Sequence, residues 1–341
     1  MPLSSLLRPQ TPLLRTLLPT LALAYGIQTG VAIPSIYYKT ERFYDLSGSL
    51  TYLSCTALSL ALPFWRARSL GQVAGIAEYL GRVGGNGAGV AGGNWWWRQA
   101  LLSVAVGVWA GRLGTYLYRR IASDNNEDSR FDSIRGSPSK FYVAFFAQAT
   151  WVSLCLLPVI SVNALPRSAF ALAGSQVRNL ASSAGAAGLA TKPYLTDVLG
   201  LGLFVFGLTF EIVADRQKSQ WVKEKKEKKH SEEFLTHGLW SRSRHPNYFG
   251  EVTLWTGIAV AAAGLLVRHP AQVGLGLEKW GFGGKAAVVA MCAASPGFVT
   301  FLLTKVSGIP LSENKYDGKF GRVKEYREWK ERTPVFFPKV W

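Results

Sequence analysis

Long apolar segments constrain this sequence more than any other feature. Several approach the ~20 residues that a helix needs to cross the apolar part of a bilayer. They lie at 13–33, 46–65, 99–121, 141–160, 195–213, 247–266 and 286–304. Within a bilayer, the backbone polar groups of a helix are all bonded inside the segment. We therefore expect an all-α fold, a multi-span transmembrane helical bundle of about seven spans.

The composition agrees with a membrane protein. Hydrophobic residues make up 48% of the 341 residues, whereas charged residues make up only 17%. The net charge of +17 could suggest nucleic acid as a partner. However, Lys and Arg concentrate in a few loops between the apolar segments, as they do at a membrane surface. We therefore expect the bilayer and a lipid as partners, and no nucleic acid. The oligomeric state stays open.

No metal site is expected. The three cysteines, Cys55, Cys155 and Cys292, all lie inside apolar segments, and no pair has metal-ligand spacing. They are interpreted as inert packing residues.

The chain divides at about residue 95. Residues 1–95 hold two apolar segments and a Gly-rich loop, and residues 96–341 hold the other five segments and a polar, basic tail. Pro34 is expected to end the first helix, residues 274–285 to form a turn, and residues 322–331 to form a short helix. Lys and Arg gather on one side of the predicted bundle, which is therefore the cytosolic side and includes the C-terminus.

The stretch from 237 to 251 is the most polar one beside an apolar segment. Its polar and charged side chains are His237, Arg242, Arg244, His245, Asn247, Tyr248 and Glu251. Pro246 fits the first turn of a helix, where its missing N–H costs nothing. Asn247 and Glu251 are four residues apart and share a helical face. Since a helix N-terminus attracts anions, the stretch predicts a phosphate or carboxylate site at the membrane surface.

Two further sets of charged residues lie at apolar segments. Arg112 is well inside the third segment, where a charge is costly, so it should face a partner or a wet cavity. Glu211, Asp215 and Lys218 fall at i, i+4 and i+7 at the end of the fifth segment, on one face of a helix.

These features together resemble the steroid 5-alpha-reductase superfamily, and in particular a branch known only as a domain of unknown function. There is also a distant similarity to sterol reductases and isoprenylcysteine carboxyl methyltransferases. The resemblance runs from about 112 to 338. Its marks are Arg112-Leu-Gly with Tyr116 and Arg119, residues 128–132, Gln148, Trp151, Pro158, and residues 215–218, 243–251, 307–310 and 325–334.

The resemblance implies an integral membrane oxidoreductase of the endoplasmic reticulum that uses NADPH. It would reduce a C=C bond of a sterol, steroid-like or enoyl lipid, typically one conjugated to a carbonyl. In the family, the residues matching Asn247 and Glu251 line the nicotinamide–ribose part of the cofactor pocket, and Asp215 matches a cofactor-binding Asp. Glu211 stands where the steroid reductases have Asn. Their substrate-polarising Glu/Tyr pair does not align with this sequence.

The remaining roles follow from the chemistry of hydride transfer, which needs alignment, exclusion of water and a proton donor. Tyr248 or Tyr116 is expected to donate the proton, with Arg112 as an electrostatic aid. The predicted cofactor-binding residues are Glu211, Asp215, Lys218, Arg242, Arg244, His245, Asn247 and Glu251, of which the basic ones would neutralise phosphates.

Two other functions stay open. Residues 244–250, Arg-His-Pro-Asn-Tyr-Phe-Gly, also match the motif with which membrane methyltransferases bind S-adenosylmethionine. Asn247, Glu251 and the face of Asp215 favour the reductase, and the paired Glu-Glu that those methyltransferases carry ahead of the tail is missing. The other function is a non-catalytic lipid-binding protein. The acid-free N-terminus also leaves a mitochondrial membrane possible.

Overall fold

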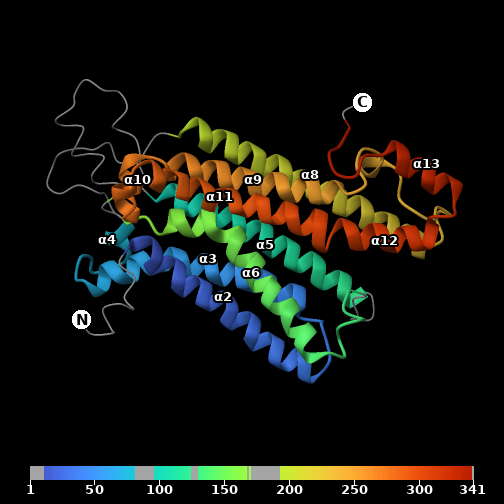
Figure 1. Ribbon diagram of the computed structural model, residues 1–341, viewed down its shortest axis with the longest axis horizontal. Helices are drawn as coiled ribbons and strands as arrows, with labels where there is room; N and C mark the ends of the chain where they lie inside the picture. Colours follow the sequence, from blue (N-terminus) through green and yellow to red (C-terminus); the bar gives the residue numbers. More distant parts are fainter. Residues whose placement is uncertain (1–10, 81–95, 124–129, 167–168, 170–192, 340–341) are drawn as a thin grey trace. The chain divides into compact units, whose positions relative to one another are not determined.

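The computed structural model describes residues 11–80, 96–123, 130–166, 169 and 193–339, and within them it is all helical (Figure 1). The α-helices are α2 (Pro12–Tyr37), α3 (Tyr44–Ser69), α4 (Ile76–Leu80), α5 (Trp97–Ser123), α6 (Pro138–Asn163), α8 (Leu195–Lys226), α9 (Pro246–Leu266), α10 (His269–Leu275), α11 (Phe282–Phe301), α12 (Ile309–Phe320) and α13 (Lys324–Arg332). Two short 3-10 helices are η1 (Gly238–Ser241) and η2 (Glu278–Trp280), and η3 (Leu302–Val306) is a π-helical turn. The predicted all-α class is confirmed.

Six helices in the described part of the chain are long and apolar enough to cross a membrane. They include α2, α5, α6, α8 and α9, and a last one that begins with α11. The sequence predicts about seven, and the difference is α3. This helix has 26 residues, but it buries hydroxyl side chains that lower its hydropathy. These are Ser47, Ser49, Thr51, Thr56 and Ser59. The chain is a multi-span helical membrane protein.

The first helix shows how local sequence sets its ends. The Thr11 hydroxyl accepts a hydrogen bond from the Leu14 N–H at 3.3 Å, and Pro12 occupies the first turn. The prediction that Pro34 ends this helix is wrong, since α2 continues to Tyr37. Pro34 lies in the last turn, where it removes a single hydrogen bond and its own carbonyl still accepts one from Tyr38.

The polar segments after α9 are more helical than predicted. Residues 274–285 do not form one turn, because they contain the end of α10, η2 and the start of α11. Gly276 ends α10 with a φ of 75°, which favours glycine. The helix predicted at 322–331 is confirmed as α13, whereas α12 was not predicted.

The chain forms two compact units, each discontinuous in sequence. The first consists of Met1–Asp197 and Ala261–Ala294, and the second of Val198–Val260 and Ser295–Trp341. The division at residue 95 stays a prediction.

In the first unit, α3 packs against α2, α5 and α6. The hydroxyls of α3 meet amide side chains from the neighbouring helices. Gln28 donates to Thr51 Oγ1 at 2.8 Å and accepts from Ser47 Oγ at 3.3 Å, while Gln148 Nε2 donates to Ser47 Oγ at 3.3 Å. Gly48 makes room for Gln148, whose Nε2 would lie 2.5 Å from an added Cβ. Two of the hydroxyls that lower the hydropathy of α3, those of Ser47 and Thr51, are therefore hydrogen-bonded inside the unit.

The same unit contains a buried ion pair. Arg98 Nη2 lies 2.7 Å from Asp197 Oδ2, and the two side chains are 3% and 7% exposed. The guanidinium also lies over two rings, with 4.2 Å to the Trp97 centroid and 4.5 Å to the Tyr194 centroid. Good geometry and added contacts are what a buried ion pair needs to offset its desolvation.

In the second unit, α8 and α9 run alongside each other (Figure 1), and their backbones come close together at glycine residues. An added Cβ on Gly207 would lie 2.5 Å from Leu254 N, and one on Gly250 would lie 2.7 Å from Gly207 O. Gly257 makes the same kind of contact with Gly200 O. Small residues at such an interface let two helix backbones approach closely without a side chain between them.

This interface predicts opposite effects for two glycine substitutions. Gly257→Ala forces a Cβ into the backbone of α8 and should destabilise the protein by about 1–3 kcal/mol. Gly202→Ala is the matched control, because nothing lies within 4 Å of an added Cβ on this α8 residue. It should leave stability unchanged or raise it by about 0.5–1 kcal/mol. Thermal unfolding of the purified protein in detergent measures both, and equal effects of the two would contradict the close packing.

Candidate functional site

The polar stretch 237–251 lies in the second unit and begins against α8. Gln217 Oε1 accepts a hydrogen bond from the Leu239 N–H at 2.9 Å. Gly238 has a φ of 63°, and an added Cβ there would lie 2.6 Å from the same oxygen. Both the backbone angle and the lack of space therefore require glycine at this position.

Trp240 joins this stretch to α8 and α13. Its buried indole Nε1 donates to the Ala214 carbonyl at 3.1 Å, and its own carbonyl accepts from Trp329 Nε1 at 3.3 Å. Lys218 Nζ lies 5.0 Å from the centroid of the Trp240 ring, a cation–π distance. The predicted face of α8 and the polar stretch are thus held together.

The segment after α13, residues 333–339, packs along residues 242–245, and we call this segment the tail. The Arg244 N–H donates to the Pro334 carbonyl at 2.9 Å, and the Lys339 N–H donates to the Arg242 carbonyl at 3.0 Å. Ser243, which is fully buried, donates from its hydroxyl to the Phe336 carbonyl at 2.9 Å. The tail therefore supplies backbone partners that the stretch lacks within itself.

Glu313 of α12 is the centre of a charged cluster. Its carboxylate lies 2.5 Å from Arg244 Nη1, 3.0 Å from His245 Nε2 and 2.9 Å from Lys330 Nζ. We call these four residues the Glu313 cluster. Lys330 also pairs with Asp317 at 2.6 Å. The sequence predicts phosphate as the partner of Arg244 and the cofactor as the partner of His245, and in the structure both contact a carboxylate of the chain itself.

His245 is buried between Glu313 and Tyr248. It is 5% exposed, and its ring stacks on Tyr248 with centroids 5.4 Å apart and planes 2° apart. Burial lowers the pKa of His245 below its ordinary 6.5, although the hydrogen bond with Glu313 opposes this. Tyr248 in turn lies beside Gly308, where an added Cβ would be 3.0 Å from its ring. The structure thus fixes the ring that the sequence predicts as a proton donor.

Two carboxylates of α8 are buried. Glu211 is 2% exposed and Asp215 is 5% exposed. The first turns of α9 are close to them, because an added Cβ on Gly250 would lie 2.9 Å from Glu211 Cβ. Asn247 and Glu251 of α9 are half-buried. Four of the predicted cofactor residues therefore lie on two helices in direct contact.

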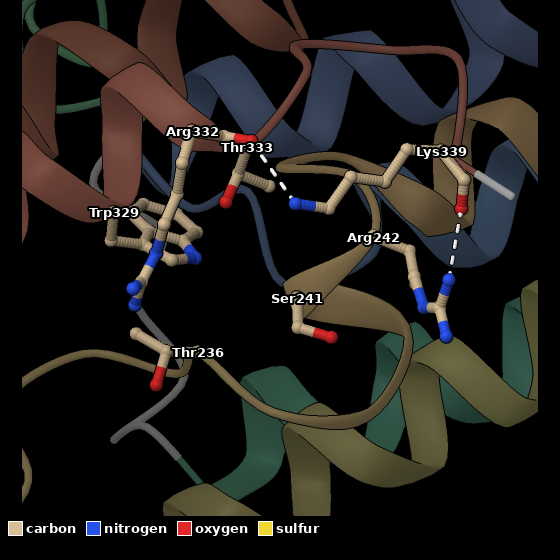
Figure 2. A pocket seen from close by; sticks show the side chains of 7 residues that line it. All are labelled: Thr236, Ser241, Arg242, Trp329, Arg332, Thr333 and Lys339. Atoms are coloured by element: carbon tan, nitrogen blue, oxygen red, sulfur yellow. Dashed lines mark hydrogen bonds between the residues drawn. The ribbon is translucent and has the colours of Figure 1, made fainter. Parts of the chain in front are cut away.

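The predicted site residues fall into two sets. Arg112 and Tyr116 lie on α5 in the first unit, both half-buried, with 5.8 Å from the guanidinium carbon to the Tyr116 ring centroid. The second unit holds the others, which are Glu211, Asp215, Lys218, Arg242, Arg244, His245, Asn247, Tyr248 and Glu251. Arg242 is outside the Glu313 cluster and lines a cavity (Figure 2).

The sequence did not reveal Glu313, Lys330 or Gln217. Glu313 pairs with a residue 69 positions away, and its own segment shows only mixed polar residues. Gly238 lies where the loop meets Gln217 of α8. Its positive φ requires glycine at this point, so this glycine is the local feature that marks the contact. Among the described residues, no group of three or more His, Cys, Asp or Glu could hold a metal ion.

The Glu313 cluster predicts a stability effect. Glu313→Gln keeps the size of the side chain but leaves Arg244 and His245 without their charged partner, so stability should fall by about 3 kcal/mol. Glu331→Gln on the exposed face of α13 is the matched control and should change it little. Thermal unfolding of the two variants in detergent makes the comparison. Equal midpoints would show that the cluster does not stabilise the unit.

His245 predicts a pH dependence. Because its folded pKa is lowered, the unfolded chain binds the proton more tightly, so stability falls as pH drops below about 6.5 towards the lowered pKa. His245→Gln should reduce the loss of unfolding midpoint between about pH 7.5 and about pH 5.5. His237→Gln, on the exposed start of the stretch, should keep the wild-type loss. A steeper loss in the His245 variant would contradict this assignment.

Comparison with known proteins gives one match. Neither the curated proteins nor the solved structures contain a match to this chain. The family model DUF1295, described as a protein of unknown function, matches residues 85–333, which is well over half of the chain. These residues include the polar stretch, the Glu313 cluster and the buried carboxylates of α8. The chain therefore belongs to the DUF1295 family of proteins of unknown function.

Proposed function

We propose that this chain is an oxidoreductase that uses NADPH to reduce a C=C bond of a sterol, steroid-like or enoyl lipid. The observation that carries the proposal is the burial of Glu211 and Asp215 on α8, with Glu211 beside the first turns of α9. Ionisable groups inside transmembrane helices are costly and generally mark a functional site. The resemblance to the steroid 5-alpha-reductase superfamily supplies the reaction class and the endoplasmic reticulum as location.

The side chains in the second unit fit such a cofactor. Carboxylates accept hydrogen bonds from ribose hydroxyls and from a carboxamide NH2, and Asp215, Glu211 and Glu251 offer these acceptors. Asn247 can both donate and accept. Lys218 and Arg242 are the cations for the phosphates, since the charge of Arg244 is already balanced by Glu313. A carboxylate-rich set with basic residues beside it matches the ribose and phosphate parts of a dinucleotide.

When bound, NADPH supplies a hydride to one carbon of the alkene. Saturation also needs one proton on the neighbouring carbon, and Tyr248 is the residue proposed to donate it and to regain it from solvent. Its ring is held against His245 and Gly308, which fixes the position of the phenol. The apolar faces of the surrounding helices exclude water, which strengthens every polar contact in the site.

Ligand-induced stabilisation tests the cofactor. NADPH at about 100 times its Kd should stabilise the detergent-purified protein by about 2.7 kcal/mol. Asp215→Asn combined with Glu251→Gln should remove this shift. Glu227→Gln, an exposed acid just after α8, is the control and should retain it. A wild-type protein that does not respond to NADPH would overturn the cofactor assignment.

Activity and a second cofactor complete the test. Oxidation of NADPH should require a lipid with a conjugated C=C bond and should not occur with its saturated analogue. Stabilisation by S-adenosylmethionine without a response to NADPH would instead assign the chain to methyl transfer. A lipid-induced shift with neither cofactor would leave a lipid-binding protein.

A further inference from the structure

A cavity of about 290 Å³ lies in the second unit, at the place where three segments meet. One segment comprises η1 and the residues beside it, another is the end of α13, and the last is the tail (Figure 2). The lining residues are Thr236, Ser241, Arg242, Trp329, Arg332, Thr333 and Lys339. Three are cationic, three carry a hydroxyl, one is an indole, and none is acidic.

We propose that this cavity binds a phosphate monoester. A phosphate monoester carries about −1.5 to −2 charges at neutral pH and three strong acceptor oxygens. Three cations and three hydroxyl groups match that charge and that number of acceptors. A carboxylate offers a single charge and two oxygens, which would leave much of the lining unused. Arginine further favours phosphate because its planar donors can bind two oxygens at once.

The side chains of Arg242 and Lys339 are held in place by backbone contacts. The Lys339 N–H donates to the Arg242 carbonyl at 3.0 Å, and Arg242 Nη1 donates to the Lys339 carbonyl at 3.4 Å. Lys339 Nζ donates to the Arg332 carbonyl at 3.2 Å (Figure 2). These bonds tie the three segments together around the cavity. A site that is organised before binding loses less conformational entropy on binding.

Two lining residues limit the shape of the cavity. Thr333 is 3% exposed and lines the cavity, so this residue forms a buried part of the wall. Trp329 is fixed by its hydrogen bond to the Trp240 carbonyl, which keeps its ring at the wall. A polar inner wall with a rigid indole beside it suits a phosphate that carries a small organic group.

The volume argues for a small ligand. About 290 Å³ is at the lower limit of the cavities that hold drug-sized molecules, roughly 300–1,000 Å³. It suits one phosphate ester group better than a whole dinucleotide. Arg242 is shared with the NADPH proposal, whereas Arg332 and Lys339 are not, so variants of these two residues test the cavity separately. The phosphate can come from a soluble metabolite or from a lipid headgroup, and the chemistry of recognition is the same.

Thermal unfolding of the full-length protein in detergent tests the proposal with glycerol 3-phosphate as the probe. We expect it to raise the midpoint, whereas potassium chloride at equal ionic strength does not. Arg332→Gln combined with Lys339→Gln should weaken binding by about tenfold or more for each residue, because each removes a hydrogen bond to a charged group. The matched control is Lys324→Gln combined with Arg327→Gln, which removes one exposed Lys and one exposed Arg from α13 and should bind normally.

A second variant distinguishes a loss of binding from a loss of folding. Thr333→Val removes the hydroxyl but keeps the shape, and it should weaken glycerol 3-phosphate binding while the midpoint in chloride stays close to that of the wild type. Equal responses to glycerol 3-phosphate and chloride would overturn the proposal. So would normal binding in the folded Arg332/Lys339 and Thr333 variants.

Nanodiscs identify the source of the phosphate. Stabilisation by phosphatidic acid, whose phosphate is a monoester, but not by phosphatidylserine, whose phosphate is a diester, assigns the site to a lipid headgroup. This effect must be lost in the Arg332/Lys339 variant. Binding of glycerol 3-phosphate without a response to phosphatidic acid assigns the site to a soluble metabolite. Equal stabilisation by both lipids that survives in the variant contradicts a monoester site.

Discussion

The second unit depends most on the ion pairs that the carboxylate of Glu313 forms. This carboxylate joins α12 to the next helix, α13, and to the polar stretch before α9, which lies 69 residues away in sequence. Arg244 and His245 are both largely buried, and a buried charge is tolerated only when it is paired and hydrogen-bonded. Through these contacts, Glu313 links the start of α9 and the helix α13.

In both units, polar side chains that lie among apolar helices contact other polar side chains. In the first unit, Arg98 pairs with Asp197, and the hydroxyls of α3 bond to Gln28 and Gln148. In the second, glycines bring α8 and α9 close enough for the buried carboxylates of α8 to lie beside the half-buried polar residues of α9. In both units these polar side chains lie at contacts between helices.

The features that could be predicted are those set by neighbours in sequence. Pro246 followed by an apolar run predicts α9 almost to the residue, and the i, i+4 spacing places Glu211 and Asp215 on one face. Glu313 could not be predicted, because its partner Arg244 is 69 residues away and nothing local distinguishes it from the other acids of the tail. The contacts of the α3 hydroxyls could not be predicted either, because Thr51 and Ser47 bond to Gln28 and Gln148 of other helices. The cofactor, the reaction and the membrane side remain predictions.

The contacts between the tail and residues 242–245 have a consequence for biosynthesis. Ser243 and Phe336 are 93 residues apart, so a ribosome makes the polar stretch long before the segment that completes its hydrogen bonds. In between, α11 must enter the membrane and α12 and α13 must form. Until then, the buried polar groups of the stretch can be satisfied only by water or by a chaperone. Final assembly of this region therefore has to wait until the segment around Phe336 has been made, after the preceding helices.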